Sequence, residues 1–156
     1  MPDHDFSHRL LFAGILLFFL ALLTGLALPI IPYPKLGLGA HLTGLMNGMF
    51  LVLLGLLWSR LVLSARAASL TFGLVVYAAY ANWIFSLLGS ILGTGHFTPQ
   101  ASGGQTAAPW KELLVGAGLV TLALAMAAGC ILLLVGLRRG VRRTEVTQGI
   151  QAVKVS

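Results

Sequence analysis

The sequence predicts an all-α integral membrane protein built as a bundle of four transmembrane helices. Hydrophobic residues make up 58% of its 156 residues and charged residues only 9%, whereas soluble domains carry roughly 25% charged residues. Apolar stretches occupy residues 10–28, 39–58, 67–92 and 113–137. Each is long enough to supply the ~20 helical residues that cross a bilayer core. Because a backbone in lipid must satisfy its own hydrogen bonds, we expect all four stretches to be helices.

The chain is expected to form one membrane domain, residues 1–140, followed by a cytoplasmic tail at residues 141–156. No internal repeat divides the apolar stretches into two units. The first stretch could instead belong to a cleaved signal peptide, but it is long for such a segment and no A-x-A cleavage motif follows it. We therefore expect it to remain as the first span.

Basic side chains are distributed unequally between the two ends of the predicted spans. Those on one side are Arg9, Arg60, Arg66, Arg138, Arg139, Arg142, Arg143 and Lys154, and those on the other are Lys35 and Lys111. An excess of Lys and Arg marks the cytoplasmic side. We therefore expect a multi-pass protein of the cell inner membrane with both termini in the cytoplasm. The basic residues lie beside apolar runs and not along a polar face, so the lipid bilayer is an expected partner and nucleic acid is not.

The second predicted span carries His41, the only histidine expected inside a span. At 100° per residue, Gly44, Gly48 and Gly55 lie within ~60° of His41 around the helix. Two interpretations fit this face. Gly44 and Gly48 form a GxxxG pair that lets another helix pack closely; alternatively, a flat cofactor lies on the glycines, with His41 as the axial ligand of haem iron. A closed structural metal site is not expected, because the other ligands that it needs are missing.

Strongly polar side chains within a span are costly and indicate a site. From the rise per residue, Asn47, Asn82 and Ser86 lie ~12, ~15 and ~9 Å below the outer end of their helices, and His41 lies at ~3 Å. We expect these four side chains to converge in the outer half of the bundle. The alternative is that the two asparagines bridge the second and third helices as polar glue, worth perhaps 0.6 kcal/mol.

Two longer segments carry a family resemblance. Together, "GAHLTGLMNGMFLVLLGLLW" and "YAAYANWIFSLLGSILGTG" resemble the hydroxylaminobenzene mutases, which are small four-helix membrane enzymes related to the styrene oxide isomerases. The resemblance extends over residues 9–138 and includes "LLTGLALP" in the first span and "PW" before the fourth. The elements AH-x(4)-MNG and YANW are fairly specific in combination and weak separately.

The resemblance implies an activity and a cofactor. The activity is the rearrangement of a small aromatic hydroxylamine to an ortho-aminophenol. The related isomerases imply a homotrimer containing ferric haem b, with His41 as the iron ligand and the cofactor lying against Gly44 and Gly48. Iron would then act as a Lewis acid.

The expected reaction assigns roles to side chains around the substrate. Asn47 and Asn82 match family asparagines and are expected to be catalytic, holding the migrating oxygen by hydrogen bonds. Tyr80 and Trp83 are expected to flank the aromatic ring, where their faces favour cationic charge. Ser86 is expected to contact the substrate.

The chain departs from the isomerase branch at two positions of the third span. That branch has an acidic residue and a tyrosine where this chain has Ala78 and Ser86. Epoxide isomerisation, of styrene oxide to phenylacetaldehyde, is therefore the alternative activity. A non-catalytic haem-binding cytochrome is a further alternative, although it would normally use two axial ligands. A small transporter or assembly protein is the last alternative, and it would carry no chromophore.

Overall fold

The structure is a computed structural model that describes the backbone of residues 2–155 and the side chains of residues 5–140. Its helices are α1 (Pro2–Leu26), α2 (Pro34–Leu57), α3 (Ala65–Leu92), the short α4 (Pro99–Ser102) and α5 (Pro109–Val155), with 3-10 turns at Leu28–Ile30 and Trp58–Arg60. Segments long and apolar enough to cross a membrane are Asp5–Leu26, Pro34–Arg60, Ala65–Leu92 and Pro109–Gly140. The described residues contain no strand. The predicted all-α class with four spans is therefore confirmed.

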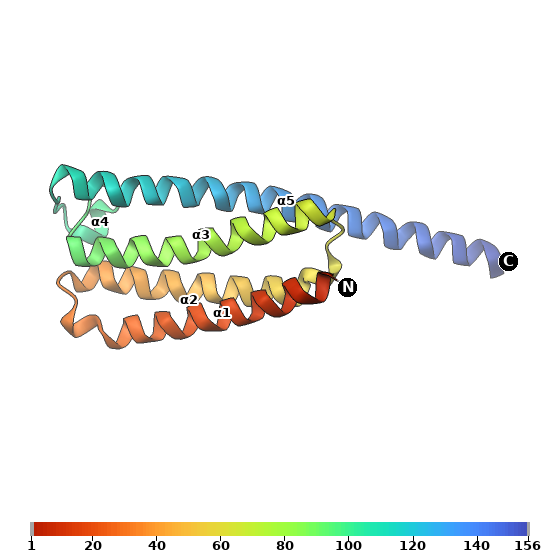
Figure 1. Cartoon of the computed structure of the whole chain (residues 1–156), viewed down its shortest axis with the longest axis horizontal. Helices are drawn as coiled ribbons and strands as arrows, with labels where there is room; N and C mark the ends of the chain where they lie inside the picture. The colour runs from red at the N-terminus through yellow and green to blue at the C-terminus, as the bar shows by residue number, and fades with distance from the viewer. Residues whose placement is uncertain (1, 156) are drawn as a thin grey trace.

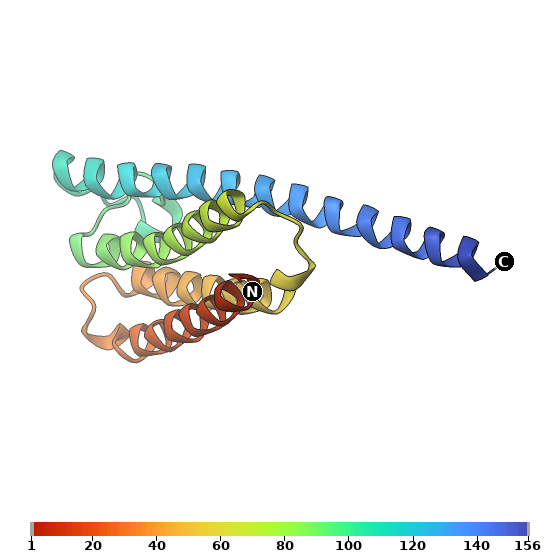
Figure 2. The same cartoon turned by 45° about the vertical axis from the view of Figure 1, so that its right-hand side comes forward.

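The four long helices lie antiparallel in a row (Figures 1 and 2). Each packs against the next in the order α1, α2, α3, α5, and α1 touches α3 over a smaller area. Among the described residues α1 makes no contact with α5, so these two helices form the edges of the row. As a result α2 packs between α1 and α3.

Local signals in the sequence begin and end these helices. Pro34 occupies the first turn of α2, where its missing N–H costs no helical hydrogen bond. The Ser64 hydroxyl accepts a hydrogen bond from the backbone N–H of Ala67 and caps α3. Gly93 ends α3 with φ of 72°, a left-handed conformation that favours glycine. The backbone of α5 stays helical through most of the predicted tail, 141–156, as far as Val155.

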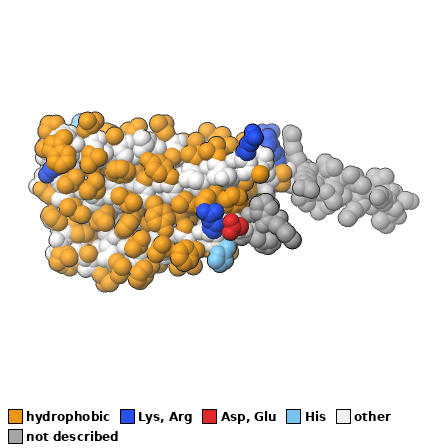
Figure 3. All heavy atoms as spheres, viewed as in Figure 1, with side chains coloured by type: hydrophobic (Ala, Val, Ile, Leu, Met, Phe, Trp, Pro, Cys, Tyr) orange, Lys and Arg blue, Asp and Glu red, His pale blue; other side chains and the backbone are white. Residues whose placement is uncertain are grey.

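The outer surface of the four helices is apolar. Figure 3 shows hydrophobic side chains over most of the visible face and Lys and Arg near the helix ends. Large side chains such as Phe12, Met46 and Leu124 are each about two-thirds exposed. Exposed apolar area on this scale is unsuited to water and is the surface expected of a protein in a bilayer.

The glycines of α2 form the contact with α1. A Cβ atom at Gly48 would lie 2.8 Å from the backbone nitrogen of Phe18 and 2.9 Å from the carbonyl oxygen of Gly14. At Gly44 it would lie 2.6 Å from the Cβ of Ala21. The packing interpretation of the glycine face is therefore correct. The assignment of Gly44 and Gly48 to cofactor binding is wrong, because α1 occupies the space that a macrocycle would need.

This contact predicts the effect of two alanine substitutions. Gly48→Ala should lower the thermal stability of the detergent-solubilised protein, because the new methyl group meets backbone atoms that cannot rotate away; overpacking of this kind costs about 1–3 kcal/mol. The matched control is Gly73→Ala in α3, where a Cβ meets nothing within 4 Å and alanine favours the helix. Melting followed by circular dichroism checks the pair, and equal melting temperatures for both variants would contradict the close approach of α1 and α2.

Candidate functional site

A cavity of about 270 Å³ lies between α2, α3, α5 and the loop that joins α3 to α5. Its polar lining consists of Thr43, Asn82, Ser86, Thr94 and Thr98. Its apolar lining includes Leu36, Ala40, Phe85, Val115 and Leu119. The cavity therefore combines an apolar wall with hydrogen-bonding groups, as small-molecule sites do.

Two residues of α3 contribute polar side chains to this cavity. Asn82 and Ser86 are one helical turn apart, and so lie on the same face of α3. Both are half-buried, and neither side chain makes a hydrogen bond to another described residue. An amide without a protein partner at membrane depth is costly. The cavity therefore offers an amide and a hydroxyl that remain available to a ligand.

His41 does not join this cavity. Its Nδ1 donates a hydrogen bond of 2.7 Å to the carbonyl oxygen of Ala21 in α1, and its ring lies over Gly25, where a Cβ would be 2.7 Å from Cε1. Thr43, two residues further along α2, lines the cavity instead. Residues two apart point to nearly opposite sides of a helix. The predicted convergence of His41 with Asn82 and Ser86 is therefore wrong within one protomer.

The hydrogen bond of His41 fixes the chemistry of its other nitrogen. A carbonyl oxygen can only accept, so Nδ1 carries the proton and Nε2 of the neutral ring keeps its lone pair. No described residue hydrogen-bonds to Nε2 of His41. In the described part of the protein, every buried side-chain nitrogen or oxygen has a hydrogen-bond partner. Because Nε2 has no partner, it is not buried and reaches the protomer surface. Histidines that ligate a metal usually donate their other ring N–H to a carbonyl, a carboxylate or water. The geometry of His41 is compatible with that role, while the described residues contain no group of three or more His, Cys, Asp or Glu that could hold a metal.

Asn47 does not line the cavity. It is half-buried and follows Thr43 by one turn, so it lies on the same side of α2. No described residue hydrogen-bonds to its side chain. The structure therefore puts Asn47 on the α3 side of α2 and His41 on the α1 side.

The two aromatic residues predicted to flank the substrate reach α1 instead. The Tyr80 hydroxyl donates a hydrogen bond of 2.8 Å to the carbonyl oxygen of Ala13, and Trp83 Nε1 donates one of 3.1 Å to Thr24 Oγ1. Trp83 also packs on Gly44. Polar atoms of buried tyrosine and tryptophan need a partner, and α1 supplies it. Neither residue lines the cavity, and their assignment to substrate binding stays a prediction.

The loop above the cavity is organised by a residue that the sequence reasoning missed. Glu112, in the first turn of α5, accepts hydrogen bonds from the backbone N–H groups of Gly95 (3.0 Å), His96 (3.2 Å) and Ala107 (2.8 Å). Bonds to a carboxylate are stronger than bonds to a neutral acceptor. Glu112 thereby ties both ends of the loop to α5. The available signal was an acidic residue directly before an apolar run in a chain with few acids.

Comparison with known proteins places this arrangement in a family. The sequence model described as styrene oxide isomerase matches residues 6–138. The chain belongs to this family. Two similar proteins come from Ectopseudomonas oleovorans. Hydroxylaminobenzene mutase HabB is 45% identical over 137 residues, which cover 87% of this chain and 84% of HabB. Hydroxylaminobenzene mutase HabA is 40% identical over 128 residues, which cover 81% of this chain and 95% of HabA.

These matches confirm the resemblance to the hydroxylaminobenzene mutases, and they make the chain an enzyme of the isomerase class. The matched segment begins in α1 and ends in α5, so it includes all four membrane helices and the cavity. No solved structure matches the chain.

The role of Glu112 predicts a local change in the loop. Glu112→Gln should make the amides of Gly95, His96 and Ala107 exchange with deuterium several-fold faster, because a neutral amide accepts weaker hydrogen bonds than a carboxylate. Lys111→Gln removes a neighbouring charge that makes none of these bonds and is the matched control. Unchanged protection of the three amides in Glu112→Gln would show that the loop is held by other contacts.

Proposed function

We propose that the protein rearranges aryl hydroxylamines of the hydroxylaminobenzene type to 2-aminophenols. The reaction breaks the N–O bond and forms a C–O bond at the ortho carbon, while the ring proton moves to nitrogen. Substrate and product are isomers, so atoms and electrons balance without a cosubstrate. The names of HabB and HabA support this choice over the epoxide isomerisation named by the family model.

The observation that carries the proposal is the free amide of Asn82 in a cavity sized for one aromatic ring. An apolar cavity of roughly 150 Å³ holds benzene, and the cavity here, at about 270 Å³, leaves room for a substituent. Phe85 and Leu119 supply the apolar wall for the ring. Asn82 and Ser86 are then available to the N-hydroxyl group.

In this proposal the protein stabilises the oxygen while it moves. As the N–O bond breaks, negative charge develops on oxygen and positive charge on the nitrogen and ring. The amide N–H of Asn82 and the hydroxyl of Ser86 donate hydrogen bonds to that oxygen, an arrangement that stabilises charge more in a site that excludes water. Asn47, on the same side of α2 as Thr43, is proposed to assist from the edge of the cavity.

We also propose that His41 holds ferric haem b. The lone pair on Nε2 fits the iron, and Leu38 and Leu45 are apolar neighbours one turn away on either side of His41. Bound haem would supply a Lewis acid. Since Nε2 reaches the surface of the protomer, a second copy of the chain would cover the macrocycle, which supports association of copies; the homotrimer itself is proposed from the family resemblance. Residence in the inner membrane with both termini in the cytoplasm is proposed from the distribution of Lys and Arg.

The activity is tested by incubating purified protein with hydroxylaminobenzene without oxygen, reductant or nucleotide. We expect 2-aminophenol, and we expect Asn82→Ala to lower turnover by about 100- to 1000-fold, the usual cost of losing one such donor. Asn47→Ala is the matched comparison and should lose less, because Asn47 does not line the cavity.

Two outcomes would contradict the proposed function. Conversion of styrene oxide to phenylacetaldehyde without any 2-aminophenol would favour the epoxide isomerase. Reversible reduction of a bound chromophore without turnover of either substrate would favour an electron-transfer cytochrome.

The haem proposal has its own spectroscopic test. Purified protein should show a Soret band that His41→Ala abolishes or shifts, because the substitution removes the free Nε2 atom. His96→Ala, in the loop between α3 and α5, is the matched control and should leave the band unchanged. An unchanged spectrum in folded His41→Ala would exclude His41 as the ligand.

A further inference from the structure

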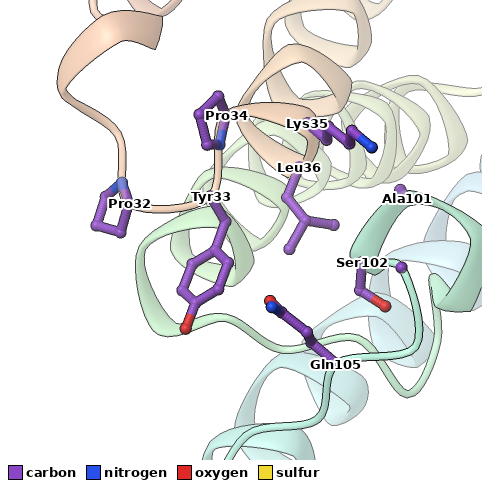
Figure 4. A pocket seen from close by; sticks show the side chains of 9 residues that line it. Pro32, Tyr33, Pro34, Lys35, Leu36, Ala101, Ser102 and Gln105 are labelled. Atoms are coloured by element: carbon purple, nitrogen blue, oxygen red, sulfur yellow. The ribbon is translucent and has the colours of Figure 1, made fainter.

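A second hollow lies directly above the cavity, between the α1–α2 loop and the loop that precedes α5. It has a volume of about 550 Å³, and its polar lining consists of Tyr33, Lys35, Ser102 and Gln105 (Figure 4). Figure 4 shows the Gln105 amide directed into the space between Tyr33 and Leu36. We name this hollow the vestibule.

The vestibule and the cavity share a wall. Leu36 of α2 and Ala101 of α4 line both spaces. Leu36 is 8% exposed, and Ala101 is half-buried. Leu36 and Ala101 therefore lie at the boundary between the two spaces.

We propose that substrate reaches the cavity and product leaves it through the vestibule, past Leu36 and Ala101, at the outer end of the helices. The substrate and product are small neutral aromatic molecules that carry hydroxyl and nitrogen substituents. Their identity rests on the proposed function, whereas the route does not. A 2-aminophenol has two polar substituents on its ring, so a polar exit suits it better than the apolar surface of the four helices.

The lining of the vestibule suits these molecules. It offers hydroxyl, amide and ammonium groups and contains no Asp or Glu, so it hydrogen-bonds neutral polar aromatics without attracting cations. The deeper cavity adds Phe85, Val115 and Leu119 for the ring. Polarity therefore falls along the path from the outer end to Asn82.

The upper wall of this path is held in place at two points. Glu112 binds both ends of the loop through Gly95, His96 and Ala107. At the start of the loop Gly93 packs on the Tyr33 ring, where a Cβ would lie 2.5 Å from Cζ. These contacts keep the loop over the vestibule.

The route is tested by thiol accessibility in detergent, which does not depend on activity. Cys130→Ala removes the native thiol, and Thr43→Cys provides a reporter inside the cavity. In this background, Leu36→Trp should slow modification by a water-soluble methanethiosulfonate by at least about ten-fold, which corresponds to a barrier higher by about 1.4 kcal/mol. Ile30→Trp is the matched control, because Ile30 is exposed at the same end of the helices and lines neither space. Ala101→Phe repeats the obstruction from the loop in case Leu36→Trp does not fold.

Each outcome either supports or contradicts the proposed route. Slower labelling with Leu36→Trp or Ala101→Phe, at an unchanged rate with Ile30→Trp, supports the route. Equal labelling rates in all variants would overturn it. For hydroxylaminobenzene we expect kcat/KM to fall in the obstructed variants, and unchanged kcat/KM alongside slowed labelling would also overturn it. If no variant and no parent protein turns over the substrate while labelling slows as expected, the proposed function fails and the route stands.

Discussion

The close approach of α2 to α1 along Gly44 and Gly48 sets the rotation of α2, and the other sites depend on that rotation. Backbone atoms of Gly14 and Phe18 leave no space for a side chain at Gly48. With this face of α2 against α1, the opposite face must point to α3. Small residues at helix contacts are the usual means of close packing in lipid, where apolar burial gives helices little preference for one another.

That rotation divides the polar groups of α2 between two places. His41 goes to the α1 side, where the Ala21 carbonyl fixes its tautomer, and Thr43 goes to the α3 side, where it meets Asn82 and Ser86 across the cavity. Tyr80 and Trp83 of α3 support this arrangement, because their hydrogen bonds to residues of α1 link α3 to α1. Any haem at His41 and any ligand in the cavity therefore lie on different sides of α2 in one protomer. Glu112 completes the cavity by holding the loop over it.

Much of the fold could be predicted from the sequence, since hydropathy alone determines which segments cross the membrane. The predicted span 67–92 and the observed α3, Ala65–Leu92, end at the same residue because Gly93 provides a clear stop. Asn82 and Ser86 were identified as site residues because polar groups are rare in a span. The sequence could not say which neighbour each face of α2 meets. A glycine face suits a helix or a cofactor equally, so Gly44 and Gly48 were misassigned. Glu112 was missed because its three partners come from a loop without a pattern.

The most direct test of this account is an experimental structure, by electron cryo-microscopy, of the full chain with the product 2-aminophenol. We expect ligand density in the cavity between α2, α3 and α5, within hydrogen-bonding distance of Asn82 and Ser86, with Trp83 still bonded to Thr24. Ligand density against His41 on the α1 side of α2, with none beside Asn82, would contradict it.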